Sequence, residues 1–464
     1  MMNTVLTEKI AIAVATFALC ASSLAAQQKQ APPAGGPPKP FNVPAHESYT
    51  MPNGMKVTLV PYGNLPKVTL SLVLRTGNLN EPADMPGLAD MVGKLMKEGT
   101  TSKSSQQIAE EAAGMGGALN ITVGADESDV TTDVLSDFGA KAAVLLADVA
   151  QHPLFPESEL PRLKTDAERQ LSISKAVPQN MALEKFRKVL YGNHPYGTVF
   201  PTEESIRKTT VADIKKFYDG NFGALRSHLF VAGRFDMAEV KKAIAASFGG
   251  WAKGPAAISN VPRVKPQHVL DLTDRPGAAQ STLLVGMPVP DATSSDAIPL
   301  GVTNALLGGS FGSRITSNIR EQKGYTYSPS SQISRRYHDA YWAETADVTT
   351  QYTGASLKEI FAEIEKLAKE PPADAELKGI QSYLSGLFVI QNSSRGALIN
   401  QLRFVDFQGL GEDYLRTYVQ KVNAVTPADV SKMTSQYIKP DQMTIVVVGD
   451  KAKVAEQVAP YGAK

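Results

Sequence analysis

The chain contains very little cysteine and histidine. Among its 464 residues there is one cysteine, Cys20, which lies in an N-terminal leader segment. The rest of the chain therefore has no disulfide framework, no thiolate nucleophile and no zinc site with cysteine ligands. Six histidines are present, and no two of them lie within five positions of each other. This spacing excludes a zinc site built from two histidines on one helix.

An excess of charge of one sign is also missing. The chain has 47 Lys and Arg against 46 Asp and Glu, which gives a formal net charge of +1. This balance argues against a nucleic-acid-binding protein, because such proteins carry clustered positive charge. Apolar residues make up 43% and charged residues 20% of the chain, so the composition predicts folded domains with sizeable cores.

The N-terminus has the pattern of a signal peptide. An apolar run over residues 10–19 follows Lys9, and small residues then predict cleavage after Ala25 or Ala26. The run is shorter than the roughly 20 residues of a membrane-spanning helix, although an uncleaved anchor is the alternative. We predict a signal peptide over residues 1–26 and a Pro-rich linker over 27–40. The mature chain is then exported, periplasmic, and without a stable membrane span.

An internal repeat divides the remainder of the chain. Thr210-Val211-Ala212-Asp213 matches Thr426-Pro427-Ala428-Asp429, which is an offset of 216 residues (210 to 426). The same offset brings Val231-Ala232-Gly233 onto Val447-Val448-Gly449. A single offset that holds through a predicted helix and into the next strand indicates a tandem duplication of one unit containing both helices and strands.

The Gly- and Pro-rich residues 252–266 predict the linker between the two copies. This gives an N-terminal domain over residues 41–251 and a C-terminal domain over 267–464. Within the first domain, residues 185–191 predict a short helix.

One glycine-rich stretch stands out in the second copy. Gly308-Gly309-Ser310-Phe311-Gly312-Ser313-Arg314 follows an apolar helical segment and precedes a second helix, which we expect to end at Gly324 in a left-handed cap. Arg320 lies on this second helix, and Tyr327 is predicted to start the next strand. A cation and a phenol could thus converge on a substrate carbonyl, although a surface ion pair and a core aromatic are the structural alternative. The glycines lack the following Lys-Ser/Thr of a P-loop, so nucleotide binding is not expected.

Together these features resemble the insulinase-type (pitrilysin-like, M16) metallopeptidase family and its non-catalytic subunits. The resemblance spans about residues 41–461 and rests on the duplicated halves and three motifs. These motifs are Gly87-Leu88-Ala89 … Gly99-Thr100, then His194-Pro195-Tyr196-Gly197, and finally the glycine-rich stretch with Arg320 and Tyr327. It implies an α+β fold of two tandem homologous domains, each a mixed, largely antiparallel β-sheet covered by helices, in a half-clamshell of the M16 type.

The sequence departs from this family at its zinc motif. Family members carry HxxEH, in which two histidines bind zinc and the glutamate activates the zinc-bound water. Here Asp90 and Lys94 stand at the two histidine positions and Gly93 at the glutamate position. The third ligand, a later glutamate, is replaced by Gln170, with Glu168 close by. No metal is therefore expected in this chain.

Asp90 and Lys94 are spaced to form an ion pair worth about 0.2–0.5 kcal/mol. Gly93 costs roughly 1 kcal/mol in a helix relative to alanine, so we interpret it as released from catalysis rather than selected for stability.

The resemblance also implies roles for the second domain. Arg320 and Tyr327 match an Arg-x6-Tyr pair that, in active relatives, points into the zinc site of the other half. Arg320 would hold the substrate backbone and Tyr327 would donate a hydrogen bond to the developing oxyanion. The glycine-rich loop of Gly308, Gly309 and Gly312 favours either close helix packing or backbone contact with an extended peptide substrate.

Three functional interpretations follow. In the first, the chain is the zinc-free, substrate-binding subunit of an exported heteromeric peptidase that acts on unfolded peptides, with zinc in an HxxEH-bearing partner. In the second, it is a catalytically inactive scaffold or chaperone-like peptide-binding protein of the same fold. A third, weaker interpretation is hydrolysis with an unusual metal site made by Asp90 and Glu168.

Overall fold

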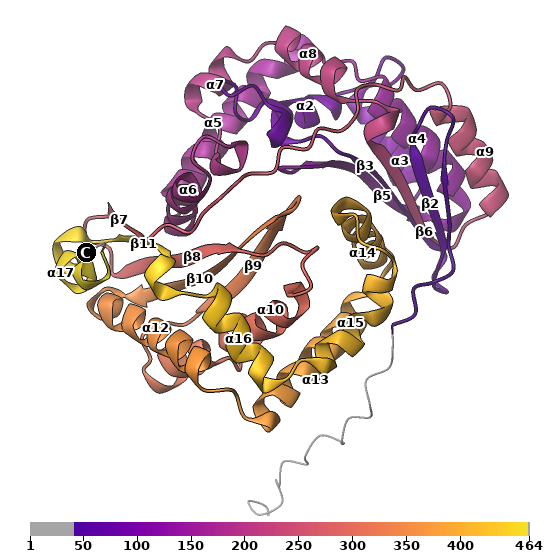
Figure 1. Ribbon diagram of the computed structural model, residues 1–464. Helices are drawn as coiled ribbons and strands as arrows, with labels where there is room; N and C mark the ends of the chain where they lie inside the picture. Colours follow the sequence, from indigo (N-terminus) through magenta and orange to yellow (C-terminus); the bar gives the residue numbers. More distant parts are fainter. Residues whose placement is uncertain (1–40, 463–464) are drawn as a thin grey trace, which may run out of the picture. The chain divides into compact units, whose positions relative to one another are not determined.

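The computed structural model of the protein describes residues 41–462, so the predicted signal peptide (1–26) and the predicted linker (27–40) lie outside the described residues. The described chain contains two β-sheets, each flanked by helices (Figure 1). The first sheet is formed by strands of the N-terminal half and the second by strands of the C-terminal half. The predicted α+β fold with two mixed, largely antiparallel sheets is confirmed.

The two sheets have the same topology. The first has the strand order β1-β2-β6-β3-β5-β4 and the second β7-β11-β8-β10-β9. Without the edge strand β1 the orders coincide, and in each sheet one neighbouring pair is parallel, β2 with β6 and β7 with β11. The strands are β1 Glu47–Thr50, β2 Lys56–Pro61, β3 Lys67–Leu74, β4 Leu119–Val123, β5 Ser128–Leu135, β6 Ser227–Gly233, β7 Val269–Asp274, β8 Gln280–Val289, β9 Ser330–Arg336, β10 Asp339–Thr349 and β11 Thr444–Gly449.

The helices follow the same duplication. Those of the first half are α2 Leu88–Met96, α3 Ser105–Gly114, α4 Gly139–Gln151, α5 Leu160–Ala176, α6 Pro178–Tyr191, α7 Glu203–Lys208, α8 Val211–Asn221 and α9 Met237–Phe248. Those of the second half are α10 Ala297–Asn304, α11 Arg314–Thr316, α12 Thr353–Lys369, α13 Asp374–Gln391, α14 Arg395–Gln408, α15 Asp413–Ala424, α16 Pro427–Tyr437 and α17 Lys451–Val458.

The repeat seen in the sequence has a local structural basis. Thr210 caps α8, and its hydroxyl accepts from the backbone N–H of Asp213 at 3.2 Å while Asp213 accepts from the backbone N–H of Thr210 at 2.9 Å. Thr426 and Asp429 make the same reciprocal bonds at the start of α16, at 3.2 and 2.9 Å. Each helix therefore begins with a capping box that satisfies backbone donors at its N-terminus.

Each sheet buries one face under helices of its own half. In β6, Leu229 and Val231 join a core formed with α2, α4, α8 and α9. In β11, Ile445 and Val447 join the equivalent core formed with α10, α12 and α16. Alternate residues of a strand point to opposite faces of the sheet, so the intervening residues of both strands must be covered from the other side.

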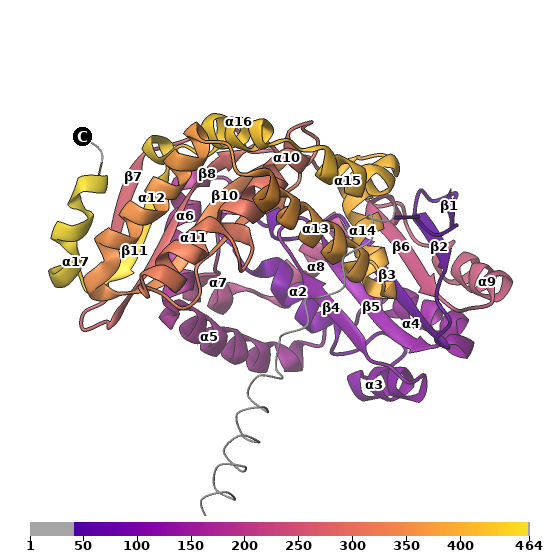
Figure 2. The ribbon, with the colours of Figure 1, turned by 90° about the horizontal axis from the view of Figure 1, so that it is seen from below.

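The other face of each sheet is covered by a helix from the opposite half. Phe186 on α6 packs with Val446 and Val448 of β11, while Leu402 on α14 packs with Phe230 of β6. Figure 1 shows α6 beside β8 and β11, and Figure 2 shows α14 beside β3 and β6. The halves thus exchange one helix each. The central strands β6 and β11 are buried on two faces as a result.

Helix α6 is longer than the sequence predicted. The prediction placed it over residues 185–191, but it begins at Pro178. Proline suits the first turn of a helix because its missing N–H has no intrahelical partner there. The buried residues Ala182, Phe186 and Leu190 recur every four positions and form the stripe that lies on the second sheet.

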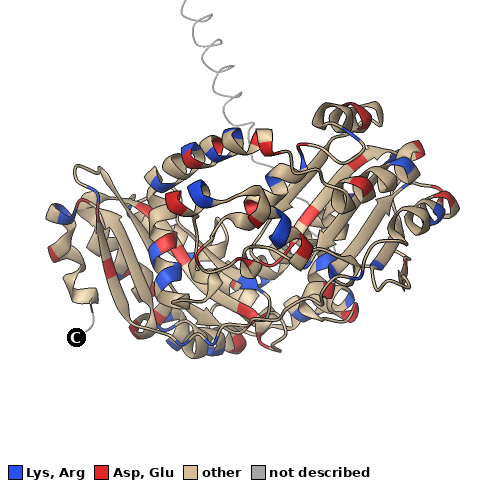
Figure 3. Ribbon diagram, turned by 90° about the horizontal axis from the view of Figure 1, so that it is seen from above, with Lys and Arg blue, Asp and Glu red and all other residues tan. Residues whose placement is uncertain are grey.

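No helix within residues 41–462 is both long and apolar enough to cross a membrane. Lys and Arg are interspersed with Asp and Glu over the elements visible in Figure 3. Many of these side chains form ion pairs, such as Arg162 with Glu98 and Arg207 with Glu168.

Candidate functional site

The glycine-rich stretch connects two helices, as the sequence predicted. Helix α10 widens into a π-type turn over residues 305–309 and ends at Ser310, whose backbone is extended. Helix α11 begins after Ser313, whose hydroxyl caps it, and also widens into a π-type turn over residues 317–322. Gly324 follows with φ +65°, so the expected left-handed cap is confirmed. Wide π-type turns occur often at functional sites.

Arg320 and Tyr327 lie in contact, but Tyr327 does not start a strand. Strand β9 begins three residues later, at Ser330. Before it, Thr326 forms an isolated bridge with Val348, and Pro329 has no N–H to continue the ladder. Tyr327 is left in the connecting segment, where 81% of its surface is exposed.

The guanidinium of Arg320 packs against two aromatic rings. Its Cζ atom lies 5.1 Å from the ring centroid of Tyr327 and 4.4 Å from that of Phe311. Phe311 is 72% exposed, whereas the side chain of Arg320 is only 22% exposed. Cation–π contacts of this kind hold the guanidinium in place while its N–H groups remain at the edge. Phe311 was not predicted as a site residue, although an aromatic residue inside a glycine-rich turn was a visible signal.

These residues line one cavity of about 440 Å³. Its wall includes Gly308, Gly309, Arg320 and Tyr327, four of the five residues assigned to substrate contact from the sequence. Gly312 is not part of this wall and lies exposed in the turn beyond it. Arg320 is the one charged side chain of the wall among the residues that the structure describes.

A buried polar cluster lies directly behind the glycines. Glu344 on β10 is 1% exposed, and neither of its carboxyl oxygens has a partner at hydrogen-bonding distance within residues 41–462. Burial raises the pKa of Glu344 well above its ordinary value, and an interaction with the backbone of Ser330, outside hydrogen-bond geometry, offsets only part of this rise. Beside it, the Ser331 hydroxyl donates to Asn304 Oδ1 at 2.8 Å.

The three positions of the missing zinc motif, Asp90, Gly93 and Lys94, lie on α2. Of these, Asp90 takes part in a network of hydrogen bonds. Asn78 donates through Nδ2 to Asp90 Oδ2 at 2.8 Å and to Glu81 Oε1 at 3.0 Å. Glu81 also accepts from the backbone N–H groups of Gly87 at 3.0 Å and Ala89 at 2.8 Å, so it satisfies the start of α2. Burial raises the pKa of Glu81 to about 7 and also raises that of Asp90. Asn78 and Glu81 were missed because they precede the motif in the sequence.

The predicted ion pair between Asp90 and Lys94 is absent from residues 41–462. Asp90 turns toward Asn78 instead, and Lys94 is exposed. The positive charge of Lys94 still acts on Asp90 from a distance, since it lowers the carboxyl pKa against the larger effect of burial. The prediction of a close ion pair was wrong because the side-chain amide of Asn78 lies within hydrogen-bonding distance of the Asp90 carboxyl, which bonds to Asn78 instead.

Gly93 has a packing role that the sequence interpretation overlooked. A Cβ added at Gly93 would lie 2.7 Å from Cγ2 of Val123 on β4. This is closer than real Cβ contacts allow, so α2 can approach β4 only because residue 93 has no side chain. Gly93 therefore stabilises the present packing, and our interpretation of it as merely released from catalysis was incomplete.

The remaining predicted position lies apart from this network. Gln170 on α5 is exposed and donates to Ser174 within its own helix at 3.2 Å. Glu168 accepts from Arg207 Nε at 2.8 Å. Within residues 41–462 no three His, Cys, Asp or Glu side chains are grouped so that they could hold a metal ion. The structure gives no support to the interpretation of a metal site made by Asp90 and Glu168.

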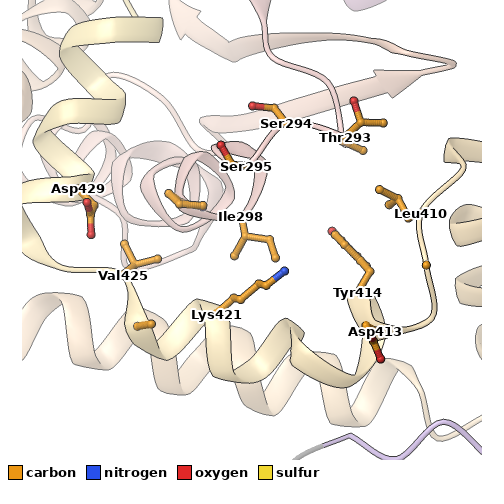
Figure 4. A pocket seen from close by; sticks show the side chains of 14 residues that line it. Thr293, Ser294, Ser295, Ile298, Leu410, Asp413, Tyr414, Lys421, Val425 and Asp429 are labelled. Carbon is orange, nitrogen blue, oxygen red and sulfur yellow. The ribbon is translucent and has the colours of Figure 1, made fainter.

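A different cavity, of about 580 Å³, lies between the segment that leads into α10 and helices α15 and α16. In Figure 4 the amine of Lys421 points into it, facing Tyr414 and Ile298. Asp429 lies at its border but is already bonded to Thr426 in the cap of α16. None of the site residues predicted from the sequence lines this cavity.

The fold and the site together define a protein of the M16 peptidase class, and comparison with known proteins agrees. The family described as "Insulinase (Peptidase family M16)" matches residues 57–200, and "Peptidase M16 inactive domain" matches residues 208–384. The chain belongs to peptidase family M16.

The similar proteins bear two kinds of name. The chain is 26% identical to the "Uncharacterized zinc protease YmxG" of Bacillus subtilis, over 72% of this chain and 79% of that protein. It is 21% identical to the "Non-peptidase homolog YmxG" of Helicobacter pylori, over 86% of this chain and 94% of that one. Among solved structures, a peptidase M16 inactive domain from Pseudomonas fluorescens superposes with a TM-score of 0.81 at 23% identity, covering 87% of this chain and 98% of that chain.

Proposed function

We propose that this chain is the zinc-free, substrate-binding subunit of an exported heteromeric M16 peptidase that acts on unfolded peptides. Zinc is supplied by a partner subunit that carries HxxEH, and Arg320 and Tyr327 complete the partner's active site. The observation that carries the proposal is the shared cavity, because Arg320, Tyr327, Gly308 and Gly309 all line it. Export of the chain rests on the signal peptide predicted at residues 1–26.

The exposed geometry supports a role in a joint active site. Arg320 and Tyr327 face an open cavity, and 81% of the Tyr327 surface is free for a substrate or a second chain to cover. Arg320 holds the peptide backbone through its N–H groups. The hydroxyl of Tyr327 donates a hydrogen bond to the oxyanion that forms at the scissile carbonyl, an interaction worth about 10²–10³ in rate.

Cleavage of a quenched fluorescent peptide tests the proposal. The mature chain is assayed with zinc, alone and together with an HxxEH-bearing homologue from the same cell. We expect activity only in the mixture, and a loss of about 10²-fold on Tyr327→Phe. Tyr383→Phe serves as the matched control, because Tyr383 is a half-exposed tyrosine on α13 outside the cavity. Equal activity of the homologue with and without this chain would refute the proposal.

A second candidate is a catalytically inactive scaffold that binds peptides or proteins. The name of the Helicobacter pylori relative, a non-peptidase homologue, favours it. This candidate predicts stable binding that does not depend on the Tyr327 hydroxyl. Peptide binding that is unchanged in Tyr327→Phe, without activity in any mixture, would select it.

A further inference from the structure

The chemistry of the glycine-rich cavity indicates which peptides it accepts. The faces of the Arg320 guanidinium pack against Phe311 and Tyr327, so its terminal N–H groups are directed along the edge. The only ion-pair contact of Arg320 within residues 41–462 is with its neighbour Glu321, from Nε to Oε1 at 3.4 Å. That distance is longer than a charge-assisted hydrogen bond, and Glu321 is itself largely exposed. The fork of Arg320 is therefore available to a ligand.

The glycines of the wall turn their backbone to the cavity. A Cβ at Gly308 would meet Glu344 and Ser331, and a Cβ at Gly309 would meet Asn304, so the missing side chains of both residues point to the interior. An extended peptide in the cavity therefore meets main-chain atoms at Gly308 and Gly309.

The charge around the cavity favours an anion. Arg320 is the single charged group of the described wall. The carboxyl of Glu344 lies behind Gly308, where burial raises its pKa and so favours its uncharged form. No acidic side chain lines the described wall, so Arg320 has no counter-charge there.

We infer that this cavity is a carboxylate subsite, which takes the free C-terminal carboxylate or an Asp or Glu side chain of an extended peptide. The fork of Arg320 binds the two carboxylate oxygens, so that Arg320 holds the extended peptide at this carboxylate, and Phe311 and Tyr327 flank the neighbouring residue of the peptide. A single planar guanidinium edge matches a planar monoanion. A phosphate dianion would require a second cation, which the described wall lacks. This inference rests on the proposed function for its ligand class, peptides.

Fluorescence anisotropy with three labelled peptides of otherwise uncharged sequence tests the inference on the mature chain. One peptide has a free C-terminus, the second is C-terminally amidated, and the third is amidated but carries one internal Glu. We expect the amidated neutral peptide to bind about 10-fold more weakly than at least one carboxylate peptide, the effect of a charge-assisted pair of hydrogen bonds. The peptide that retains affinity identifies whether the carboxylate is terminal or on a side chain.

Variants then locate the subsite. Arg320→Lys keeps the charge but removes the planar fork, so it should reduce the roughly 10-fold preference for carboxylate. Arg416→Lys is the control, because Arg416 is exposed and, within residues 41–462, pairs only with Glu412 and Asp413 at the start of its own helix. Thermal unfolding of each variant verifies that it remains folded.

The outcomes separate this inference from the proposed function. Equal affinity for all three peptides, or no peptide binding, would overturn the carboxylate subsite, as would displacement of the carboxylate peptide by inorganic phosphate at equal concentration. If the mixture with the HxxEH homologue is active while no carboxylate preference exists, the proposed function holds and the subsite does not. If carboxylate preference exists and depends on Arg320 while every mixture is inactive, the subsite holds and the split active site does not.

Discussion

The carboxyl group of Glu344 fills the space that a side chain at Gly308 would need. A Cβ added at Gly308 would lie 2.5 Å from Oε2 of Glu344 and 2.6 Å from Oγ of Ser331. All three residues are buried, so neither neighbour can easily move away. Residue 308 is thus a glycine because strands β9 and β10 bring two polar side chains against the inner side of the loop.

Gly308→Ala should destabilise the protein by about 1–3 kcal/mol, the usual cost of overpacking a filled interior. Gly312→Ala is the matched control in the same loop, since a Cβ there would meet nothing within 4 Å. Its effect should stay within about 0.5 kcal/mol. Urea denaturation of both variants measures the difference, and equal effects would mean that the loop tolerates a side chain at position 308.

Gly93→Ala tests the packing of α2 on β4. Alanine improves helix propensity by about 1 kcal/mol, but the contact with Val123 opposes this gain with about 1–3 kcal/mol of overpacking. Gly386→Ala on α13 isolates the propensity, because a Cβ there meets nothing within 4 Å. We expect the Gly386→Ala variant to be more stable than the natural chain. The Gly93→Ala variant should be less stable than the Gly386→Ala variant by about 1–3 kcal/mol. The same gain in both variants would remove the packing role of Gly93.

Glu81 should make stability depend on pH. Its folded-state pKa of about 7 lies above the ordinary value of 4.5, so the folded state holds a proton that the unfolded state releases. The resulting stabilisation is fully present below pH 4.5 and is lost as the pH rises to 7, by up to about 3 kcal/mol.

Unfolding free energies measured between pH 4.5 and 8 should therefore fall more steeply for the natural chain than for Glu81→Gln, which cannot titrate. Parallel curves for the two proteins would contradict the raised pKa.

Arg403 ties the two halves together through a charged contact. It lies on α14 and donates to Glu127 Oε2 at 2.7 Å and to Asp129 Oδ2 at 3.2 Å, both from the first half. Its side chain is 23% exposed. Arg403→Met should cost roughly 3 kcal/mol, because it leaves two buried carboxylates without their partner. The exposed Arg416, changed to Met, should cost less than about 1 kcal/mol. Thermal denaturation compares the two variants, and similar losses would show that the cross-half contact adds little.

The local features of the fold were predictable from the sequence. Thr210 with Asp213 and Thr426 with Asp429 are capping boxes, which are formed by residues three positions apart and so leave a visible pattern. The same holds for the glycine-rich turn and for the end of its second helix at Gly324. Such signals depend on neighbours along the chain and need no knowledge of the tertiary structure.

Features that depend on distant neighbours were not predictable. The apolar stripe of α6 predicts that it is buried, but not that it lies on the sheet of the other half. Gly93 looks unfavourable within its helix until Val123, thirty positions later, is placed against it. The partner of Asp90 was misassigned for the same reason, since Lys94 is close along the helix whereas Asn78 reaches it only through the fold.

At the candidate site, the motif supplied Arg320, Tyr327, Gly308 and Gly309, which the structure brings to one cavity. It did not supply Phe311 or Glu344 as neighbours of the site, because a family motif records spacing and not which side chains stack or are left unpaired. The catalytic roles of Arg320 and Tyr327 stay predictions until the mixing experiment is made.

The exchange of α6 and α14 between the halves has a consequence for the origin of such a chain and for the production of one half alone. One half produced alone would leave the inner face of its sheet, including Phe230 or Val446, open to water. The simplest way to cover that face is a second copy that lends its helix, so a gene for a single half would encode an obligate two-fold dimer. Joining two such copies in one polypeptide fixes their pairing. Each copy is then free to specialise, because neither has to remain self-complementary.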